Sequence, residues 1–208
     1  MKKNYGHQYS FSLSFWMVLF FVIPTLLILI YAFLKKAPQG GVLWEFSLDA
    51  FKVIFNPTIL KISWMTLYIS LIATFLTLFL ALPAAYYIAR SPHKDTLLLL
   101  VIIPFWINFL IRIYAWIAIL GNNGFFNIFL KKVGLLEESL QFLYNSPAVI
   151  LITVYTYLPY AILPLYASIE KFDFSLLEAA RDLGASKAQS IVKVFLPGIK
   201  AGIITAGL

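Results

Sequence analysis

The sequence predicts an all-α integral membrane protein that crosses the bilayer several times. Hydrophobic residues make up 62% of the 208 residues, charged residues make up only 12%, and the mean hydropathy is +0.88. A water-soluble domain carries about 25% charged residues, so this composition excludes a water-soluble domain. The apolar residues also gather into runs long enough for a helix to cross the roughly 30 Å hydrocarbon core, which takes about 20 residues.

Four apolar runs predict four complete spans. Their approximate limits are Phe15–Phe33, Ser63–Ala89, Leu97–Leu120 and Pro147–Ala167. The first run follows Lys2 and Lys3, as in a signal peptide, but it is long and no small-x-small cleavage site follows it, so we interpret it as a span. Residues 198–208 begin a fifth apolar run that is too short to cross a bilayer. We expect this run to be the truncated fifth span of a longer membrane protein.

The charged connecting segments predict the orientation of the spans. With residues 1–14 on the cytoplasmic side, the inner segments hold nine Lys and Arg residues and the outer segments hold six. This bias is modest, but its direction predicts a cytoplasmic amino terminus.

The two outer segments differ in character. Segment 34–62 has Gly and Pro near its start and is expected to be an amphipathic loop on or near the outer face. Segment 121–146 opens with a Gly-Asn-Asn-Gly turn and is expected to contain a short helix at Phe125–Val133. Asn145 precedes Ser146-Pro147, which predicts the N-cap of the fourth span because proline is tolerated in the first helical turn.

The composition excludes several chemistries. The chain has no cysteine and two histidines, so we predict no catalytic residue and no metal site. None of the four predicted spans contains Asp or Glu, whereas carriers driven by protons or sodium often hold the ion with an intramembrane carboxylate. Any uphill transport is therefore expected to draw its energy from a partner. The net charge of +7 lies in segments that flank apolar runs, which argues for a topology signal and against nucleic-acid binding.

Aromatic side chains and a proline mark a candidate translocation path in the third and fourth spans. Pro159 removes the hydrogen bond to the Tyr155 carbonyl, which is tolerable only against protein or a water-filled cavity. Aromatic faces attract ammonium groups by roughly 0.5 to 2 kcal/mol, so such a path suits an organic cation. Trp116 and Tyr166, which stand nearer the helix ends, are instead interpreted as part of the belt of Trp and Tyr found at membrane boundaries. The candidate residues are Trp106, Asn108, Tyr155, Tyr157, Pro159 and Tyr160.

Two other polar features lie within the spans. Arg112 is the single charged residue there, and it is interpreted either as an anion site or gate, or as an arginine near the outer boundary that reaches the headgroups; we favour the second. A stripe of hydroxyl side chains on the second span is interpreted as a helix-packing face, with pathway lining as the alternative. Its members are Ser63, Thr66, Ser70, Thr74 and Thr77.

The segment 168–197 is a polar island between apolar runs, and its spacing predicts a short helix that ends at a glycine. Ser175 and Glu178 form a capping box, so a helix is expected over Leu176–Leu183. Gly184 is expected to end this helix in the left-handed conformation.

A second capping box, Ser186 with Gln189, predicts another helix that continues to around Pro197. The first of these helices has room for only about two turns, so packing against another surface must stabilise it. That surface is either membrane lipid or a protein partner. The small side chains of Ala179 and Ala180 favour a protein partner, because they permit close approach.

The residues of this segment resemble the cytoplasmic coupling loop of permeases from binding-protein-dependent ABC importers. The matching positions are Glu178, Ala179, Ala180, Gly184, Leu196 and Pro197, and Val194 replaces the more usual isoleucine. The stretches 103–114 and 164–186 are similar to the permeases of polyamine (spermidine/putrescine) importers, and this likeness covers nearly the whole chain.

The resemblance implies a type I, MetI-like permease fold with six spans, over 15–208, in a bacterial inner membrane. The implied partners are a second homologous permease, two ATP-binding subunits and an external substrate-binding protein. The chain would be a transport subunit rather than an enzyme, with ATP and Mg held by the partner ATPase, and it has no P-loop motif. The implied ATPase-coupling residues are Glu178, Ala179, Ala180, Arg181, Asp182, Gly184, Leu196 and Pro197. The alternatives are a permease for another small solute, such as an anion, phosphonate or metal chelate, and a membrane scaffold.

Overall fold

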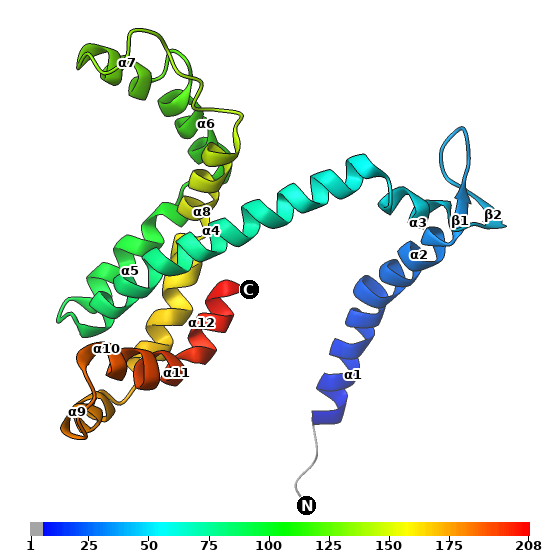
Figure 1. Cartoon of the computed structure of the whole chain (residues 1–208). Coiled ribbons are helices and arrows are strands. Elements are labelled where there is room, and N and C mark those ends of the chain that lie inside the picture. Colours follow the sequence, from blue (N-terminus) through cyan, green and yellow to red (C-terminus); the bar gives the residue numbers. More distant parts are fainter. Residues whose placement is uncertain (1–5) are drawn as a thin grey trace, which may run out of the picture. The chain divides into compact units, whose positions relative to one another are not determined.

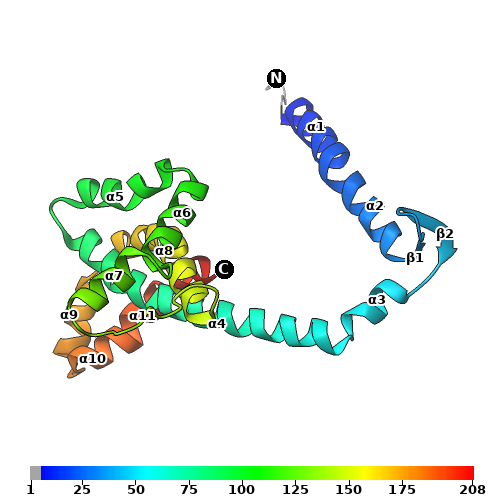
Figure 2. The same cartoon turned by 90° about the horizontal axis from the view of Figure 1, so that it is seen from above.

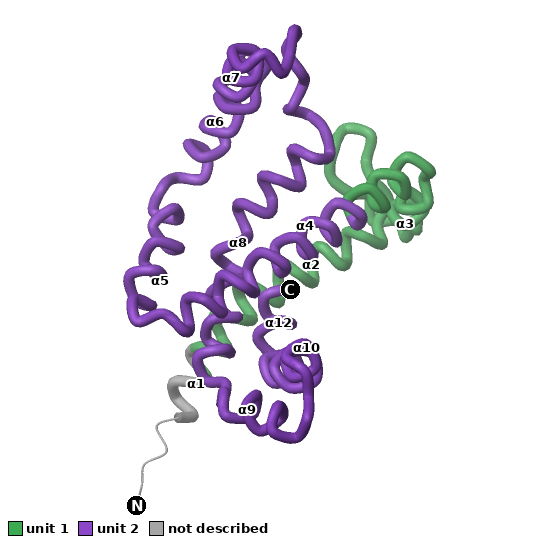
Figure 3. Tube along the Cα trace, turned by 60° about the vertical axis from the view of Figure 1, so that its left-hand side comes forward, with its two compact units in different colours: residues 1–66 green, residues 67–208 purple. Residues whose placement is uncertain are grey.

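A computed structural model of the chain describes residues 6–208, and most of these residues are helical (Figure 1). The predicted all-α class is confirmed, apart from one small two-stranded sheet. The chain divides into two units, residues 1–66 and 67–208 (Figure 3). They are called unit 1 and unit 2 below, and each is described by itself.

Within the described residues, four helical stretches are long and apolar enough to cross a membrane, as the sequence predicted. They are Leu13–Ala32, Pro57–Arg90, Phe109–Lys132 and Ser146–Glu170. A bent pair of helices, Lys187–Gly198 and Lys200–Gly207, meets at 68° and would add a fifth if it is counted as one span. The number of complete spans agrees with the sequence, but the limits of the third do not.

Unit 1 starts with a nearly continuous helical run. α1 (Gly6–Met17) is followed by a π-helical turn (Val18–Val22) and then by α2 (Ile23–Ala32). Pro24 stands in the first turn of α2 and has no N–H to give to the preceding turn, where the hydrogen-bond pattern widens. The first predicted span is therefore helical along its whole length.

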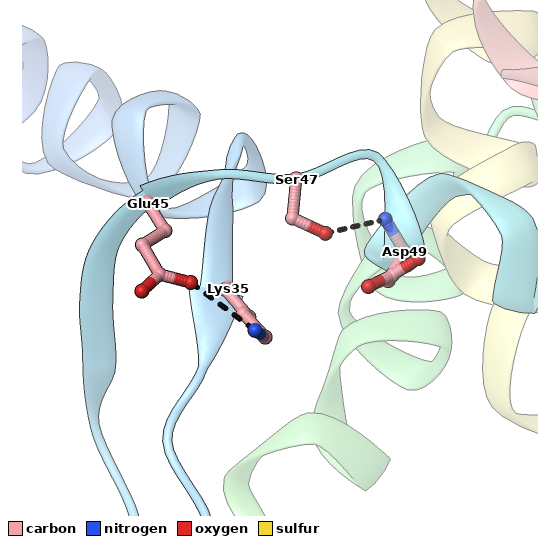
Figure 4. Close-up of polar contacts among 4 residues, drawn as sticks. All are labelled: Lys35, Glu45, Ser47 and Asp49. Atoms are coloured by element: carbon pink, nitrogen blue, oxygen red, sulfur yellow. Dashed lines mark hydrogen bonds and ion pairs between the residues drawn. The ribbon is translucent and has the colours of Figure 1, made fainter.

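A β-hairpin follows at once, where the sequence predicted an amphipathic loop. β1 (Leu34–Lys36) pairs antiparallel with β2 (Val42–Phe46), and the turn between them contains two glycines with positive φ. The Lys35 Nζ atom lies 3.1 Å from the Glu45 Oε2 atom across the two strands (Figure 4). The hairpin passes into a short helix, α3 (Asp49–Ile54), whose first N–H is donated to the Ser47 hydroxyl at 3.1 Å (Figure 4). The loop prediction is therefore wrong.

α4 (Pro57–Arg90) is one unbroken helix of 34 residues that begins earlier than the predicted Ser63. Its buried residues recur every three or four positions, so they share one face. Three of them are alanines, which allow neighbouring helices to approach closely in a membrane. This face consists of Ala73, Thr77, Ala81, Ala85 and Ile88.

The predicted third span, Leu97–Leu120, is not one helix. α5 (Lys94–Ile102) passes into a 3-10 turn (Ile103–Trp106), the backbone becomes extended at Ile107, and α6 (Phe109–Leu120) then begins. Pro104 explains the break, because it cannot donate the hydrogen bond that would continue α5 and it disfavours a helical conformation at the preceding residue.

The predicted helix in the second outer segment is confirmed as α7 (Phe125–Lys132). Asn127 is 1% exposed and holds this segment together, because its side chain bonds the Gly121 carbonyl and both the N–H and the carbonyl of Leu140. α8 (Ser146–Glu170) then starts where predicted, with the Asn145 side chain accepting from the Ala148 N–H at 2.9 Å. The helix continues through Pro159 without interruption.

The remaining helices are α9 (Ser175–Asp182), α10 (Lys187–Ser190), a π-helical turn (Ile191–Phe195), α11 (Leu196–Gly198) and α12 (Lys200–Gly207). α12 lies side by side with α8 (Figures 1 and 2). A Cβ atom at Gly202 would lie 2.4 Å from the Ser168 hydroxyl oxygen, so this position has no room for a side chain. The core of unit 2 gathers here, around Leu165, Ile169 and Ile199, which are almost fully buried.

Candidate functional site

The start of α9 differs from the predicted capping box. Ser175 is already the first helical residue, and its side chain makes no cap hydrogen bond. The acceptor is instead the Asp173 carboxylate, which takes the Ser175 N–H at 3.0 Å. Hydrogen bonds from the side chain and backbone of Ser175 hold the pKa of Asp173 below its usual value. A carboxylate is also favoured at a helix amino terminus by the helix dipole, which explains why Asp173 takes this place.

The end of α9 agrees with the prediction. Gly184 has φ of +88°, in the left-handed region. The Gly184 N–H is donated to the Arg181 carbonyl at 2.9 Å, and the Ala185 N–H is donated to the Ala180 carbonyl at 3.0 Å. This pair of bonds is a Schellman motif, which satisfies carbonyls that the helix end would leave free.

The second predicted capping box is present at the start of α10. The Ser186 hydroxyl accepts the Gln189 N–H at 3.2 Å, and the Gln189 side chain accepts the Ser186 N–H at 2.9 Å. The helix continues as predicted to the region of Pro197, but through a π-helical turn. Pro197 lacks the N–H that an α-helix would supply to the carbonyl four residues earlier, which favours such a widened turn.

The predicted ATPase-coupling residues divide into an exposed and an inward group. Glu178, Ala179, Arg181, Asp182, Gly184 and Pro197 are exposed, whereas Ala180 and Leu196 are half-buried. Leu183, at the end of α9, is 90% exposed. Leu177 points the other way and is 7% exposed, so it anchors α9 to the core. α9 thus presents a polar rim and two exposed leucines to its surroundings, Leu176 at 49% and Leu183 at 90% exposure.

Aromatic side chains connect α9 to α4. Phe174, just before α9, lies edge-on to Tyr86 with 6.0 Å between ring centroids, and the Arg90 guanidinium carbon lies 4.6 Å from the centre of its ring. Phe172 and Phe195 pack edge-to-face at 5.3 Å in the same cluster. Such pairs add to the stability that burial alone provides.

An ion pair fixes the same junction from another side. The Lys94 Nζ atom, at the first residue of α5, lies 2.5 Å from the Glu170 Oε1 atom, at the last residue of α8. This hydrogen bond from Lys94 to the carboxylate raises the pKa of Lys94. The junction between α8 and α9 is therefore held by both ends of the α4–α5 turn, Arg90 and Lys94, a feature that the sequence did not reveal.

The candidate path residues are only partly brought together. The Tyr160 ring lies 4.5 Å from the Phe105 ring, and the Tyr155 ring lies 5.3 Å from that of Trp116, in both cases centroid to centroid. The break after α5 therefore lies against α8 near Pro159. Tyr157 stands beside Tyr160, with 6.2 Å between centroids.

Trp106 and Asn108 differ from the other candidates. Trp106 is 76% exposed, away from the contacts of Phe105 with α8. The Asn108 side chain accepts the Leu110 N–H at 2.8 Å, so it caps α6. An N-cap is needed at Asn108 because a new helix begins there, whereas the sequence interpretation expected one continuous span.

Arg112 lies near the start of α6, beside two phenylalanine rings. Its guanidinium carbon is 5.8 Å from the Phe105 ring centre and 5.7 Å from that of Phe109. Its Nε atom is buried and has no hydrogen-bond partner in the described part of the chain. The sequence interpretation placed Arg112 near the outer boundary of a continuous third span. Because that span is broken before α6, the position of Arg112 along the predicted Leu97–Leu120 helix does not give its depth in the membrane.

Comparison with known proteins identifies the family. Residues 70–208 match the family described as "Binding-protein-dependent transport system inner membrane component". The chain belongs to this family. The resemblance of the chain to ABC-importer permeases is thereby confirmed, and the chain is a multi-pass transport component of the inner membrane, not an enzyme.

Curated relatives extend along most of the chain. The spermidine/putrescine transport system permease protein PotB of Escherichia coli is 40% identical over 195 residues, which are 93% of this chain and 71% of the relative. PotB of Haemophilus influenzae is 39% identical over 195 residues, which are 93% of this chain and 68% of the relative. The sulfate transport system permease protein CysW of Escherichia coli is 28% identical over 72% of this chain and 50% of the relative. The similarity to polyamine permeases that the sequence suggested is thus confirmed.

Proposed function

We propose that the chain is a permease subunit of an ATP-driven ABC importer that carries polyamines, spermidine or putrescine, into the cell. The observation that carries this proposal is the 40% identity to PotB along 93% of the chain. The aromatic lining near Pro159 supports a cationic cargo, because ring faces attract ammonium groups by about 0.5 to 2 kcal/mol each.

In this proposal the chain works within a larger complex. It pairs with a second homologous permease, two ATP-binding subunits and an external substrate-binding protein, and its amino terminus is cytoplasmic. ATP and Mg are held by the ATPase, and the chain itself binds no cofactor. α9 and α11 meet the ATPase through the exposed coupling residues, and α9 moves when the ATPase subunits close.

The family assignment does not by itself select the cargo, because CysW, named for sulfate transport, also matches most of the chain. An anion permease is therefore the second candidate, and Arg112 with its buried unpaired Nε atom is the residue that favours it. We would reconstitute the chain with the subunits that co-purify with it and measure ATP hydrolysis with each cargo's binding protein. Stimulation by spermidine or putrescine, and none by sulfate, supports the proposal; stimulation by sulfate alone contradicts it.

The coupling surface is tested separately. Leu183→Glu places a charge on the bare leucine at the end of α9 and is expected to lower the amount of ATPase that co-purifies by at least tenfold. Leu135→Glu is the matched control, because Leu135 is 68% exposed and follows α7 at the other end of the bundle. A Leu183→Glu protein that keeps its ATPase would contradict docking at α9 while leaving the cargo assignment intact.

A further inference from the structure

A cavity of about 440 Å³ is lined by α4, α8 and the end of α12. Five hydroxyl groups face it, and we call it the hydroxyl cavity. Ser70, Thr74 and Thr77 come from α4, and Thr153 and Tyr157 come from α8. The remaining lining residues are small or aliphatic, and none of the lining residues is charged. Three members of the hydroxyl stripe that the sequence assigned to helix packing therefore line an open space.

The threonines of the cavity differ from two threonines of the same helices that stand outside it. Thr66 and Thr156 donate their hydroxyl hydrogens to the carbonyl groups four residues earlier, at 2.9 and 2.7 Å. Thr74, Thr77 and Thr153 make no side-chain hydrogen bond of this kind within the described residues. Their hydroxyl groups are therefore free to bind a ligand.

Thr77 shows most clearly that these hydroxyls open into the cavity. Its residue is only 5% exposed. Among the buried and half-buried residues that the structure describes, the Arg112 Nε atom is the one fully enclosed side-chain nitrogen or oxygen without a partner. The Thr77 oxygen has no partner either, so it is not enclosed by packing and reaches the cavity.

Thr77 also lies within the hydrocarbon core for every position of the bilayer along the uncharged part of α4. It stands 16 residues after Lys61 and 13 residues before Arg90, the charges that bound this part. At about 1.5 Å per residue, these separations are about 24 and 20 Å along the helix. A core of roughly 30 Å placed anywhere between the two charges includes Thr77. An unpaired hydroxyl is costly there, so the cavity calls for a polar occupant.

Three features of the lining select a positively charged hydrogen-bond donor as that occupant. The Ser70 hydroxyl donates to the Leu67 carbonyl at 3.0 Å, so the Ser70 oxygen can only accept from a ligand. The Tyr157 ring offers a face that attracts cations. No Lys or Arg lines the cavity to balance the charge of an anion. A primary ammonium group, with three N–H donors and no acceptor, fits this combination.

We propose that the hydroxyl cavity holds one ammonium group of the cargo during its passage. The oxygens of Thr74, Thr77 and Thr153 accept its N–H groups, and the Tyr157 ring faces its charge. This inference deepens the proposed function and rests on it, because it requires a polyamine cargo. Neutral hydroxyl acceptors hold an ammonium group more weakly than carboxylates do, which suits a path that must release what it binds.

Uptake of spermidine is measured with the chain reconstituted in vesicles together with the subunits that co-purify with it and a spermidine-binding protein. In Thr77→Val/Thr153→Val, valine keeps the shape of both side chains and removes both hydroxyls. We expect uptake to fall at least tenfold, while the amount of co-purifying ATPase stays unchanged. Thr77→Ser/Thr153→Ser keeps both hydroxyls and should retain most of the uptake.

Thr66→Val/Thr156→Val is the matched control, because it also removes one hydroxyl from α4 and one from α8, and neither lines the cavity. Its uptake should equal that of the unaltered protein. Normal uptake by the first double variant contradicts the site, since a packing role needs only the shape that valine keeps. An equal loss in the control contradicts it as well. If the unaltered protein carries sulfate and no spermidine, the proposed function itself fails.

The unaltered protein gives a test that needs no variant. A spermidine analogue with a photoactivatable diazirine is added to the same complex, and the cross-linked peptides are identified by mass spectrometry. Labelling is expected within residues 70–77 and 153–157, and an excess of spermidine, but not of sulfate, should prevent it. If neither segment is labelled, or if excess spermidine leaves the labelling unchanged, the hydroxyl cavity does not hold the cargo.

Discussion

Among single residues, Gly184 has the clearest structural role, because its positive φ forms the turn that ends α9. Its φ of +88° lies where a side chain is strained, yet a Cβ atom there would meet nothing within 4 Å. The cost of any side chain is therefore conformational rather than steric, and Gly184 sets the turn that separates α9 from α10.

Gly184→Ala is accordingly expected to lower the free energy of unfolding by about 1–2 kcal/mol. Gly184→Asn is the matched control and should cost less, because asparagine adopts the left-handed conformation more readily. Thermal unfolding of the purified protein measures both. Equal stability of the alanine variant and the unaltered protein would contradict the role of the positive φ.

Asp173 makes the start of α9 sensitive to acid. Its pKa lies below the ordinary value of 3.8 in the folded protein because the carboxylate accepts hydrogen bonds from Ser175. The stabilisation is therefore complete above pH 3.8 and is lost as the pH falls through the lowered pKa. Asp173→Ala should be less stable than the unaltered protein near neutral pH and equally stable in strong acid. Thermal unfolding across this range, with Asp173→Asn as the control that keeps an acceptor at every pH, measures the effect.

At the scale of elements, the break between α5 and α6 changes the meaning of Asn108. The residue was predicted as path lining, but in the structure its side chain caps α6. A cap and a path residue respond differently to substitution, so the two roles can be separated.

Asn108→Ala is expected to lower the free energy of unfolding by about 1 kcal/mol, whereas Asn108→Ser keeps a capping oxygen and should cost little. Unfolding and uptake are measured on both variants. If serine preserves stability but abolishes uptake, Asn108 acts on the cargo and not only on the helix.

At the scale of the whole molecule, the α4–α5 turn joins elements that are far apart in the chain. Arg90 and Lys94 hold the residues on either side of the α8–α9 junction. Under the proposed function, this junction carries motion from the ATPase to the spans, so its contacts should matter for coupling more than for stability. The Lys94–Glu170 pair is exposed to water, and such pairs add little to stability.

Lys94→Glu and Glu170→Lys are each expected to lower uptake per ATP hydrolysed several-fold, because like charges then face each other. The double exchange should restore uptake. Lys132→Glu on α7 is the matched control and should leave the ratio unchanged. If uptake per ATP hydrolysed is as low in the double variant as in the single variants, the loss of the Lys94–Glu170 ion pair does not explain the lower uptake.

The sequence predicted correctly the features that depend on residues close together in the chain, such as helix caps and turns. The caps at Asn145 and Ser186 and the turn at Gly184 each depend on groups within about five residues, and all three are confirmed. The limits of the first and fourth spans were likewise close, because long apolar runs specify membrane helices.

Other features needed more than local patterns. The Gly40-Gly41 turn signal of the hairpin was present, but the short apolar strands beside a span looked like a loop. Pro104 marked the break in the third span and was outweighed by the apolar run around it. The Lys94–Glu170 pair joins residues 76 positions apart, which no sequence spacing indicates. The roles of the coupling and path residues depend on partners and cargo, so they stay predictions.

The π-helical turn at Ile191–Phe195 has a rotational consequence. Residues five apart in an α-helix point about 140° away from each other, at ~100° per residue. Ser190 and Phe195 are nevertheless both buried, at 0% and 4% exposure, because pairing from i to i+5 winds the backbone more slowly. The π-helical turn thus reduces the rotation between Ser190 and Phe195, so the buried side stays continuous from α10 to α11. Deleting a single residue within it would leave Ser190 and Phe195 four positions apart, which is about 40° in an α-helix, so an ordinary α-helical turn would then keep both on the buried side.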